Sequence, residues 1–113
     1  MARISRVFKA DIVRSIKSNQ ITTTYQNLGS ALTSPLVTVT FKNTMNVTVF
    51  ISEDGTNDHY EMPPGSTEVV DMQANAATNP GQGHKAVGTQ FKARYESGRA
   101  PRHGKIIMQG QYV

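Results

Sequence analysis

The clearest fold signal in the chain is the run Leu36-Val37-Thr38-Val39-Thr40-Phe41-Lys42, in which apolar and polar residues alternate strictly. Val37, Val39 and Phe41 share one face, whereas the two threonines and the lysine share the other. Successive side chains of a β-strand point to opposite sides of the sheet, so this period of two is typical of a strand. We therefore predict a strand at residues 36–42 with one buried and one exposed face.

Further strands are expected on both sides of this run. Residues 47–52 place Val47, Val49 and Ile51 on one face, and the polar-leaning segment 43–46 connects them to the first strand, a pattern typical of a β-hairpin. Other segments rich in β-branched or aromatic residues end at turn residues such as Pro and Gly. These predicted strands cover residues 21–26, 59–62, 67–72, 89–95 and 105–113.

Six or seven short strands, spaced about 10–12 residues apart and separated by turns, indicate the fold class. We predict an all-β protein, a compact antiparallel β-sandwich that is jelly-roll-like. Within the strand at 89–95, Phe91, Ala93 and Tyr95 are expected to face the core. Residues 73–88 have almost no bulky apolar side chain and are expected to form a long exposed loop.

The first twenty residues follow a different pattern. Ile4, Phe8, Ile12 and Ile16 recur every four residues, a spacing that fits an amphipathic helix and an alternating strand nearly equally. We predict an extended N-terminal arm at 1–20 that needs a partner surface, followed by a β-sandwich domain at 21–113. Whether the arm is helical or extended before docking stays open.

Length and composition limit the class of protein. The chain has 113 residues, 37% of them hydrophobic, which suits one domain with a small core. It has no cysteine, which excludes disulfides, Cys-type zinc sites and thiol nucleophiles. No apolar run approaches the roughly 18 residues of a membrane span, and the basic N-terminus lacks the apolar stretch of a secretory signal. We expect no membrane partner.

The formal net charge of +4 is unevenly distributed. Residues 1–20 hold five basic residues against one acidic, residues 53–71 hold six acidic and no basic, and residues 85–105 hold six basic against one acidic. Basic ends could bind phosphate, or the acidic middle of one subunit could meet a basic end of another. A six-carboxylate block is unusual in a dedicated nucleic-acid binder, so the second interpretation is favoured over the first. A third interpretation, that the charges simply form solvated faces of loops and strands, stays open.

No segment carries a catalytic pattern. The histidines His59, His84 and His103 lie in or beside turns without a triad motif. The carboxylates at 53–61 do not match an EF-hand loop, although cation binding by the turn at 53–58 stays open, and residues 81–84 lack the context of a phosphate loop. We expect no catalytic residue, no metal ligand and no cofactor, and hence a protein that is not an enzyme.

Several turn-and-strand motifs resemble those of a known group of proteins. They are Val49-Phe50-Ile51-Ser52 followed by Asp54-Gly55 and Asp58-His59, then Pro63-Pro64-Gly65-Ser66, Val69-Val70-Asp71-Met72 and Gly88-Thr89-Gln90-Phe91. Over roughly residues 20–113 the chain resembles small virion structural proteins of tailed bacteriophages. The resemblance implies a virion location as a capsid decoration (cement) protein or a head–tail, collar or tail component. It implies a homo-oligomer whose partners are major capsid, portal or adaptor, or tail proteins.

This interpretation selects an assembly interface. The arm would be the docking element, and the acidic turn would meet a basic neighbour. The interface residues are Arg3, Arg6, Phe8, Ile12, Arg14, Ile16, Glu53, Asp54, Asp58, Arg99 and Arg102. The alternative function is a small basic nucleic-acid-binding β-barrel that uses Lys92, Arg94, Arg99, Arg102 and Lys105.

Overall fold

The computed structural model describes residues 9–71, 85–96, 98 and 100–112, and this part of the chain contains strands and no helix. No helix that could cross a membrane therefore occurs among these residues. The strands are β1 (Lys9–Ala10), β2 (Arg14–Lys17), β3 (Gln26–Asn27), β4 (Thr38–Asn43), β5 (Val49–Ser52), β6 (Tyr60–Met62), β7 (Thr67–Asp71), β8 (Lys92–Tyr95) and β9 (Lys105–Tyr112).

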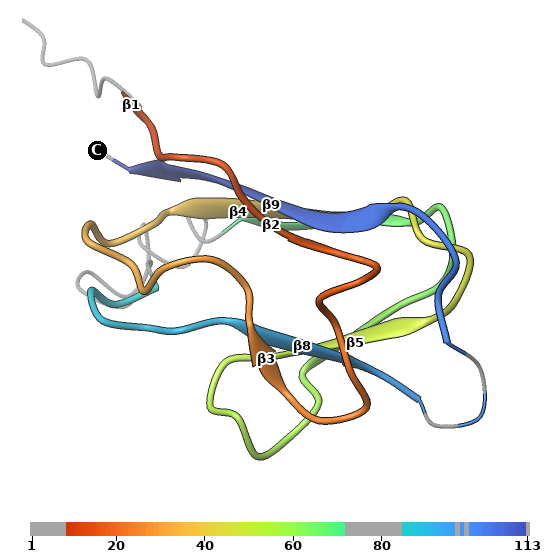
Figure 1. Cartoon of the computed structure of the whole chain (residues 1–113). Coiled ribbons are helices and arrows are strands. Elements are labelled where there is room, and N and C mark those ends of the chain that lie inside the picture. Colours follow the sequence, from red (N-terminus) through yellow and green to blue (C-terminus); the bar gives the residue numbers. More distant parts are fainter. Residues whose placement is uncertain (1–8, 72–84, 97, 99, 113) are drawn as a thin grey trace, which may run out of the picture.

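The strands form two antiparallel sheets that lie face to face (Figure 1). Sheet A has the order β1-β9-β4-β7, and β2 pairs with β9 beside β1. Sheet B has the order β3-β8-β5-β6. The predicted all-β, antiparallel sandwich is confirmed.

The strand pairs are nested in the way that defines a jelly roll. The hairpin β5–β6 is innermost, and β4 pairs with β7, β3 with β8 and β2 with β9 around it. The chain is thus a long antiparallel ribbon rolled into two sheets, with β2-β9-β4-β7 in one and β3-β8-β5-β6 in the other. The jelly-roll-like part of the fold prediction is confirmed as well.

The core lies between the sheets and consists of the faces that the alternation predicts. Val39 and Phe41 of β4 are fully buried, as are Val49 and Ile51 of β5. The Phe41 ring packs against rings of the opposite sheet, with centroids 5.4 Å from Phe91 and 5.3 Å from Tyr60. Phe91 and Ala93 are buried as predicted, whereas Tyr95 is half-buried at the edge of the core.

The predicted hairpin between residues 36–42 and 47–52 is wrong, because β4 lies in sheet A and β5 in sheet B. The connection crosses the core instead of turning tightly, and Met45 and Val47 are buried in it. Asn43 fixes the crossing, since its buried amide donates to the carbonyls of Val47, Met62 and Pro63 and its Oδ1 accepts from the Met45 N–H. The hairpin that does form is β5–β6.

The strand predicted at 21–26 is shorter than expected, because only Gln26 and Asn27 pair with β8. Thr22 Oγ1 bonds instead to the Thr24 backbone and side chain and accepts from the Gln26 amide. Such local side-chain bonds compete with a ladder. The loop predicted at 73–88 lies largely outside the described residues, and Lys85 at its end forms a bridge with Leu36.

The predicted arm differs from the structure in its second half. Residues 9–17 are the edge of sheet A, where β1 pairs with the end of β9 and β2 with its beginning. Arg14 and Ile16 are buried in the sandwich, so this stretch is extended and belongs to the folded domain. Residues 1–8 lie outside the described part.

Candidate functional site

The turn between β5 and β6 was expected to face a neighbouring subunit, and its first carboxylate is occupied locally. Asp54 Oδ1 accepts hydrogen bonds from the N–H groups of Asn57 and Thr56, at 2.9 and 2.8 Å, and from Ser52 Oγ at 3.0 Å. These donors, the Asn57 N–H foremost, hold the pKa of the Asp54 carboxyl far below its usual value. Asp54 therefore shapes its own turn.

The second carboxylate, that of Asp58, binds side chains of β8 and of the segment before β3. It forms an ion pair with Arg94, 2.5 Å from Oδ2 to Nη2, and accepts a hydrogen bond from the Tyr25 hydroxyl. The bond from Arg94 is the main cause of a lowered Asp58 pKa. Arg94 also lies over the rings of Phe50 and Tyr25, 4.8 and 5.6 Å from their centroids.

The third carboxylate, Glu53, pairs with Lys85 at 2.7 Å and accepts from the Tyr60 hydroxyl. Burial, and then this hydrogen bond, raise the pKa of Tyr60. Glu53 and Asp58 thus already have cationic partners in their own subunit. Their side chains are still 23% and 30% exposed, so contact between these two residues and a basic neighbour stays a prediction.

The arm residues of the predicted interface separate into three groups. Arg3, Arg6 and Phe8 lie outside the described residues. Arg14 and Ile16 are inside the domain, 3% and 4% exposed, and so cannot form a docking surface in this fold. Ile12 is 63% exposed, and its neighbour Val13 is 61% exposed.

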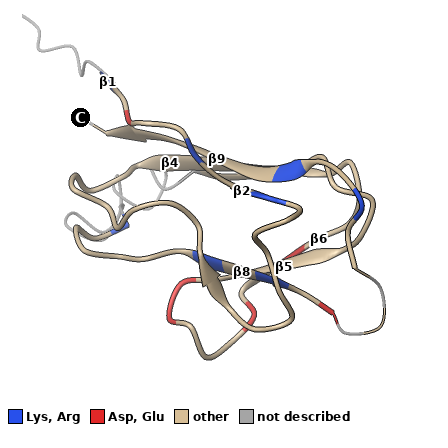
Figure 2. Cartoon of the chain, in the orientation of Figure 1, with Lys and Arg blue, Asp and Glu red and all other residues tan. Residues whose placement is uncertain are grey.

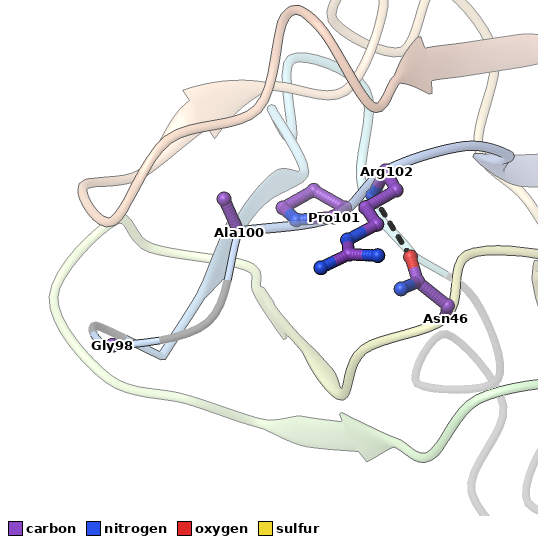
Figure 3. A pocket seen from close by; sticks show the side chains of 5 residues that line it. All are labelled: Asn46, Gly98, Ala100, Pro101 and Arg102. Carbon is purple, nitrogen blue, oxygen red and sulfur yellow. Dashed lines mark hydrogen bonds between the residues drawn. The ribbon is translucent and has the colours of Figure 1, made fainter.

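The two arginines of the predicted interface near the C-terminal end also differ. Arg99 lies outside the described residues. Arg102 is exposed at a hollow of about 670 Å³ that Asn46, Gly98, Ala100 and Pro101 also line (Figure 3). Its backbone N–H donates to Asn46 Oδ1 at 2.9 Å, which ties this loop to the β4–β5 connection.

The described basic residues of the alternative function, which leave out Arg99, do not share one surface. Lys92 and Arg94 belong to β8 of sheet B, where they bond to Asn27 and Asp58. Lys105 begins β9 of sheet A, and Arg102 lies in the loop before it. The structure therefore does not assemble the proposed set into one nucleic-acid-binding patch.

The histidines form no described catalytic group. His59 Nδ1 accepts from the Glu53 N–H at 3.0 Å, which gives it a role in the turn, and His103 is exposed. His84 lies outside the described residues. Among the residues that the structure places, no three of the types His, Cys, Asp and Glu gather as a metal site would require.

The outer face of sheet A carries exposed apolar side chains. One row of side chains crosses the sheet in the order Val13, Gln109, Thr40, Val69. Thr40 pairs with both Gln109 and Val69, and Val13 lies opposite Gln109 because the next residue, Arg14, pairs with Met108. We call these four residues the valine row. A shallow hollow of about 340 Å³ lies along it, beside Val13, Thr40 and Gln109.

The valine row ends in an exposed valine at each edge strand, Val13 beside β2 and Val69 in β7 at 58% exposure. Sequence reasoning missed both. The sequence indicates only that Val69 and Val70, as neighbours in a strand, point to opposite faces of the sheet. Alternation alone does not tell whether Val69 or Val70 faces solvent, because that depends on which side of β7 is covered by sheet B.

Comparison with protein-family models, with curated proteins and with solved structures gives no match.

Proposed function

We propose that the protein is a non-enzymatic structural subunit that assembles with further copies of itself through the edges of sheet A. One observation carries the proposal: the valine row runs from edge to edge and leaves an exposed valine at each edge, Val13 just before β2 and Val69 in β7. Exposed β-branched residues on edge strands promote pairing with another chain, and monomeric proteins usually avoid them.

The directions of the strands favour a head-to-tail contact. The strands β2, β9, β4 and β7 alternate in direction across sheet A, so its two edges, β2 and β7, run antiparallel. A second copy shifted sideways would therefore bring its β7 antiparallel to β2 of the first. Such a heterologous contact continues the sheet and generates a ring or a filament.

The two edges also match in register. If the valine row continues across the contact, Val69 of one copy lies beside Val13 of the next, with Cβ atoms about 5 Å apart. In the adjoining row, Thr67 would lie beside Ser15. Neither row brings like charges together, and the apolar pair is removed from water.

The β2 edge is selectively blocked, which would fix this register. The Ile12 N–H is bound by the Asp11 side chain, and the Lys17 N–H by the Gln20 side chain. The stretch that remains for pairing lies between these two positions, around Val13 and Ser15. A short open stretch disfavours slipped alignments.

We assign this subunit to a virion of a tailed bacteriophage on the motif resemblance given above. The jelly roll supports the assignment, because capsid proteins frequently use it, although a fold alone does not define a function. In that setting the partners are other copies and capsid, portal or tail proteins. Reading frames for such proteins beside its gene would support the assignment, whereas a purely metabolic neighbourhood would oppose it.

Light scattering during size-exclusion chromatography tests the assembly contact. Val13→Lys and Val69→Lys should each yield monomers, because each blocks one edge. An equimolar mixture of the two variants should give a 1:1 dimer, since each retains the edge that the other lacks. Val87→Lys is the matched control, because Val87 is 59% exposed and lies outside sheet A.

Two outcomes would contradict the contact. Wild-type protein that stays monomeric at high concentration has no such assembly. Variants that oligomerise like the Val87→Lys control would place the contact elsewhere on the subunit.

A further inference from the structure

A group of lysines lies at one end of the outer face of sheet A, away from the valine row. Lys17 of β2 pairs in register with Lys105 of β9. Lys42 of β4 is two residues from Thr44, whose N–H donates to the Lys105 carbonyl, so it lies diagonally from Lys105 on the same face. All three side chains are exposed. We call Lys17, Lys42 and Lys105 the lysine patch.

The pairing of Lys17 with Lys105 is close. Ser18 N–H donates to the Gly104 carbonyl at 3.1 Å, so the next pair along, Lys17 and Lys105, is of the non-hydrogen-bonded kind. In such pairs the Cα atoms are only about 4.5 Å apart. Like charges directly opposite each other destabilise a sheet, and an anion held between them would remove that repulsion.

No carboxylate of the described residues compensates this patch. The acidic groups that form ion pairs do so with Arg14, His59, Lys85 and Arg94, none of which belongs to the patch. Arg102 is exposed in the loop just before Lys105 and adds to the positive potential at the same end of the molecule. Figure 2 shows Lys and Arg gathered there on β2, on β9 and in that loop.

The backbone beneath the lysines is firmly held. Thr44 Oγ1 accepts from the Lys105 N–H at 2.9 Å, and the Thr44 N–H donates to the Lys105 carbonyl at 3.0 Å. The Lys17 carbonyl accepts from the N–H groups of Gln20 and Ile21, which fixes the turn after β2. The three ammonium groups therefore extend from a rigid platform, which lowers the entropy lost on binding a multivalent ligand.

We propose that the lysine patch binds the phosphate backbone of a nucleic acid without reading its sequence. Three ammonium groups spread over three strands suit a repeating anion better than a single small one. Lysine is depleted in protein–protein contacts but is a principal phosphate ligand in nucleic-acid complexes. No aromatic residue lies in the patch for stacking on bases, so contacts to phosphate dominate.

Fluorescence anisotropy with a labelled random-sequence DNA duplex tests the proposal on the full chain. Three phosphate contacts give a slope of about −2.7 in log K against log salt, which is a loss of roughly 40-fold between 50 and 200 mM salt. The double variant Lys17→Gln/Lys105→Gln should bind far more weakly, with a slope near −0.9. The matched control is Lys9→Gln/Lys92→Gln, which removes the same charge away from the patch and should keep the wild-type slope.

Three results would overturn the proposal. Wild-type protein that does not bind at 50 mM salt has no such site. Equal weakening in both double variants would mean that net charge alone attracts DNA. A lysine variant with altered oligomeric state but unchanged DNA binding would show that the patch meets carboxylates of another subunit.

The test is separable from the assembly proposal. The oligomeric state is measured by light scattering and DNA binding by anisotropy, and the Val69→Lys variant keeps the lysine patch intact. Thermal melting of the lysine variant shows that it folds, and the melting temperature should not fall, because a repulsive pair has been removed.

Discussion

Arg14 and Asp11 form a buried ion pair at the edge of sheet A, with Nη1 of the arginine 2.8 Å from Oδ2 of the aspartate. Their side chains are only 2% and 8% exposed. The guanidinium also donates to the carbonyls of Ile12, Ser30 and Ala31, and so joins the edge strand to the loop after β3. Arg14, which the sequence suggests as part of a docking arm, thus holds two segments of the domain together. We call this set of bonds the Arg14 clamp.

Replacing Arg14 should be strongly destabilising. Arg14→Ala would leave Asp11 as a buried charge without its partner and three carbonyls without a donor, and we expect a loss of about 3–5 kcal/mol in the free energy of unfolding. Lys9→Ala, at an exposed position on the same edge, should cost less than about 0.5 kcal/mol. Urea denaturation measures both, and equal effects would contradict the clamp.

Asn43 should matter more for stability than its polar character suggests. Asn43→Ala removes the amide that binds three carbonyls where the chain crosses from sheet A to sheet B. We expect a loss of about 2–4 kcal/mol, because those buried carbonyls would lack a donor. Asn57→Ala in the exposed turn is the control. A small effect in chemical denaturation would mean that water replaces the amide.

Two glycines with positive φ should respond differently to alanine. Gly104, at φ +89°, lies so close to Thr44 that an added Cβ would be 2.3 Å from its carbonyl oxygen, whereas Gly65, at φ +76°, has open space there. Gly65→Ala should cost only the backbone strain, about 1–2 kcal/mol. Gly104→Ala should cost about 3 kcal/mol or more, because backbone must also move. Similar melting temperatures would contradict the close approach.

The pair of Asp58 and Arg94 should give an acid-dependent part of the stability. The Asp58 pKa is lowered in the folded state from its usual 3.8, so the unfolded chain binds the proton more readily. The stabilisation is present above pH 3.8 and is lost as the pH falls toward the folded-state pKa. Urea denaturation between pH 5 and about 2 measures the free energy of unfolding at each pH. This free energy should fall less steeply with falling pH in Asp58→Asn than in the wild-type protein. If the variant loses stability with falling pH as steeply as the wild-type protein, another carboxylate causes the acid sensitivity, and Asp54 would be the first to test.

The sequence predicted more of the core than of the site. Alternation correctly placed Val39, Phe41, Phe91 and Ala93 inside, because a two-residue period is a local property of a strand. The β4–β5 hairpin was predicted wrongly, since the turn-like segment gave no sign that Asn43 would bind carbonyls of a distant loop. The acidic turn was expected to meet a basic neighbouring subunit, and its partners within the chain, Arg94 and Lys85, were not predicted because they lie far away in the sequence.

The sequence alone determined the fold class: an all-β sandwich follows from strand periodicity and turn chemistry, both of which act over a few residues. The tertiary structure decided which surfaces remain available. Burial of Arg14, internal pairing of the acidic turn, exposure of Val13 and Val69, and the approach of Lys17 to Lys105 all depend on pairing between distant strands. Local patterns do not encode that pairing, because it is set by which faces bury the most apolar surface together.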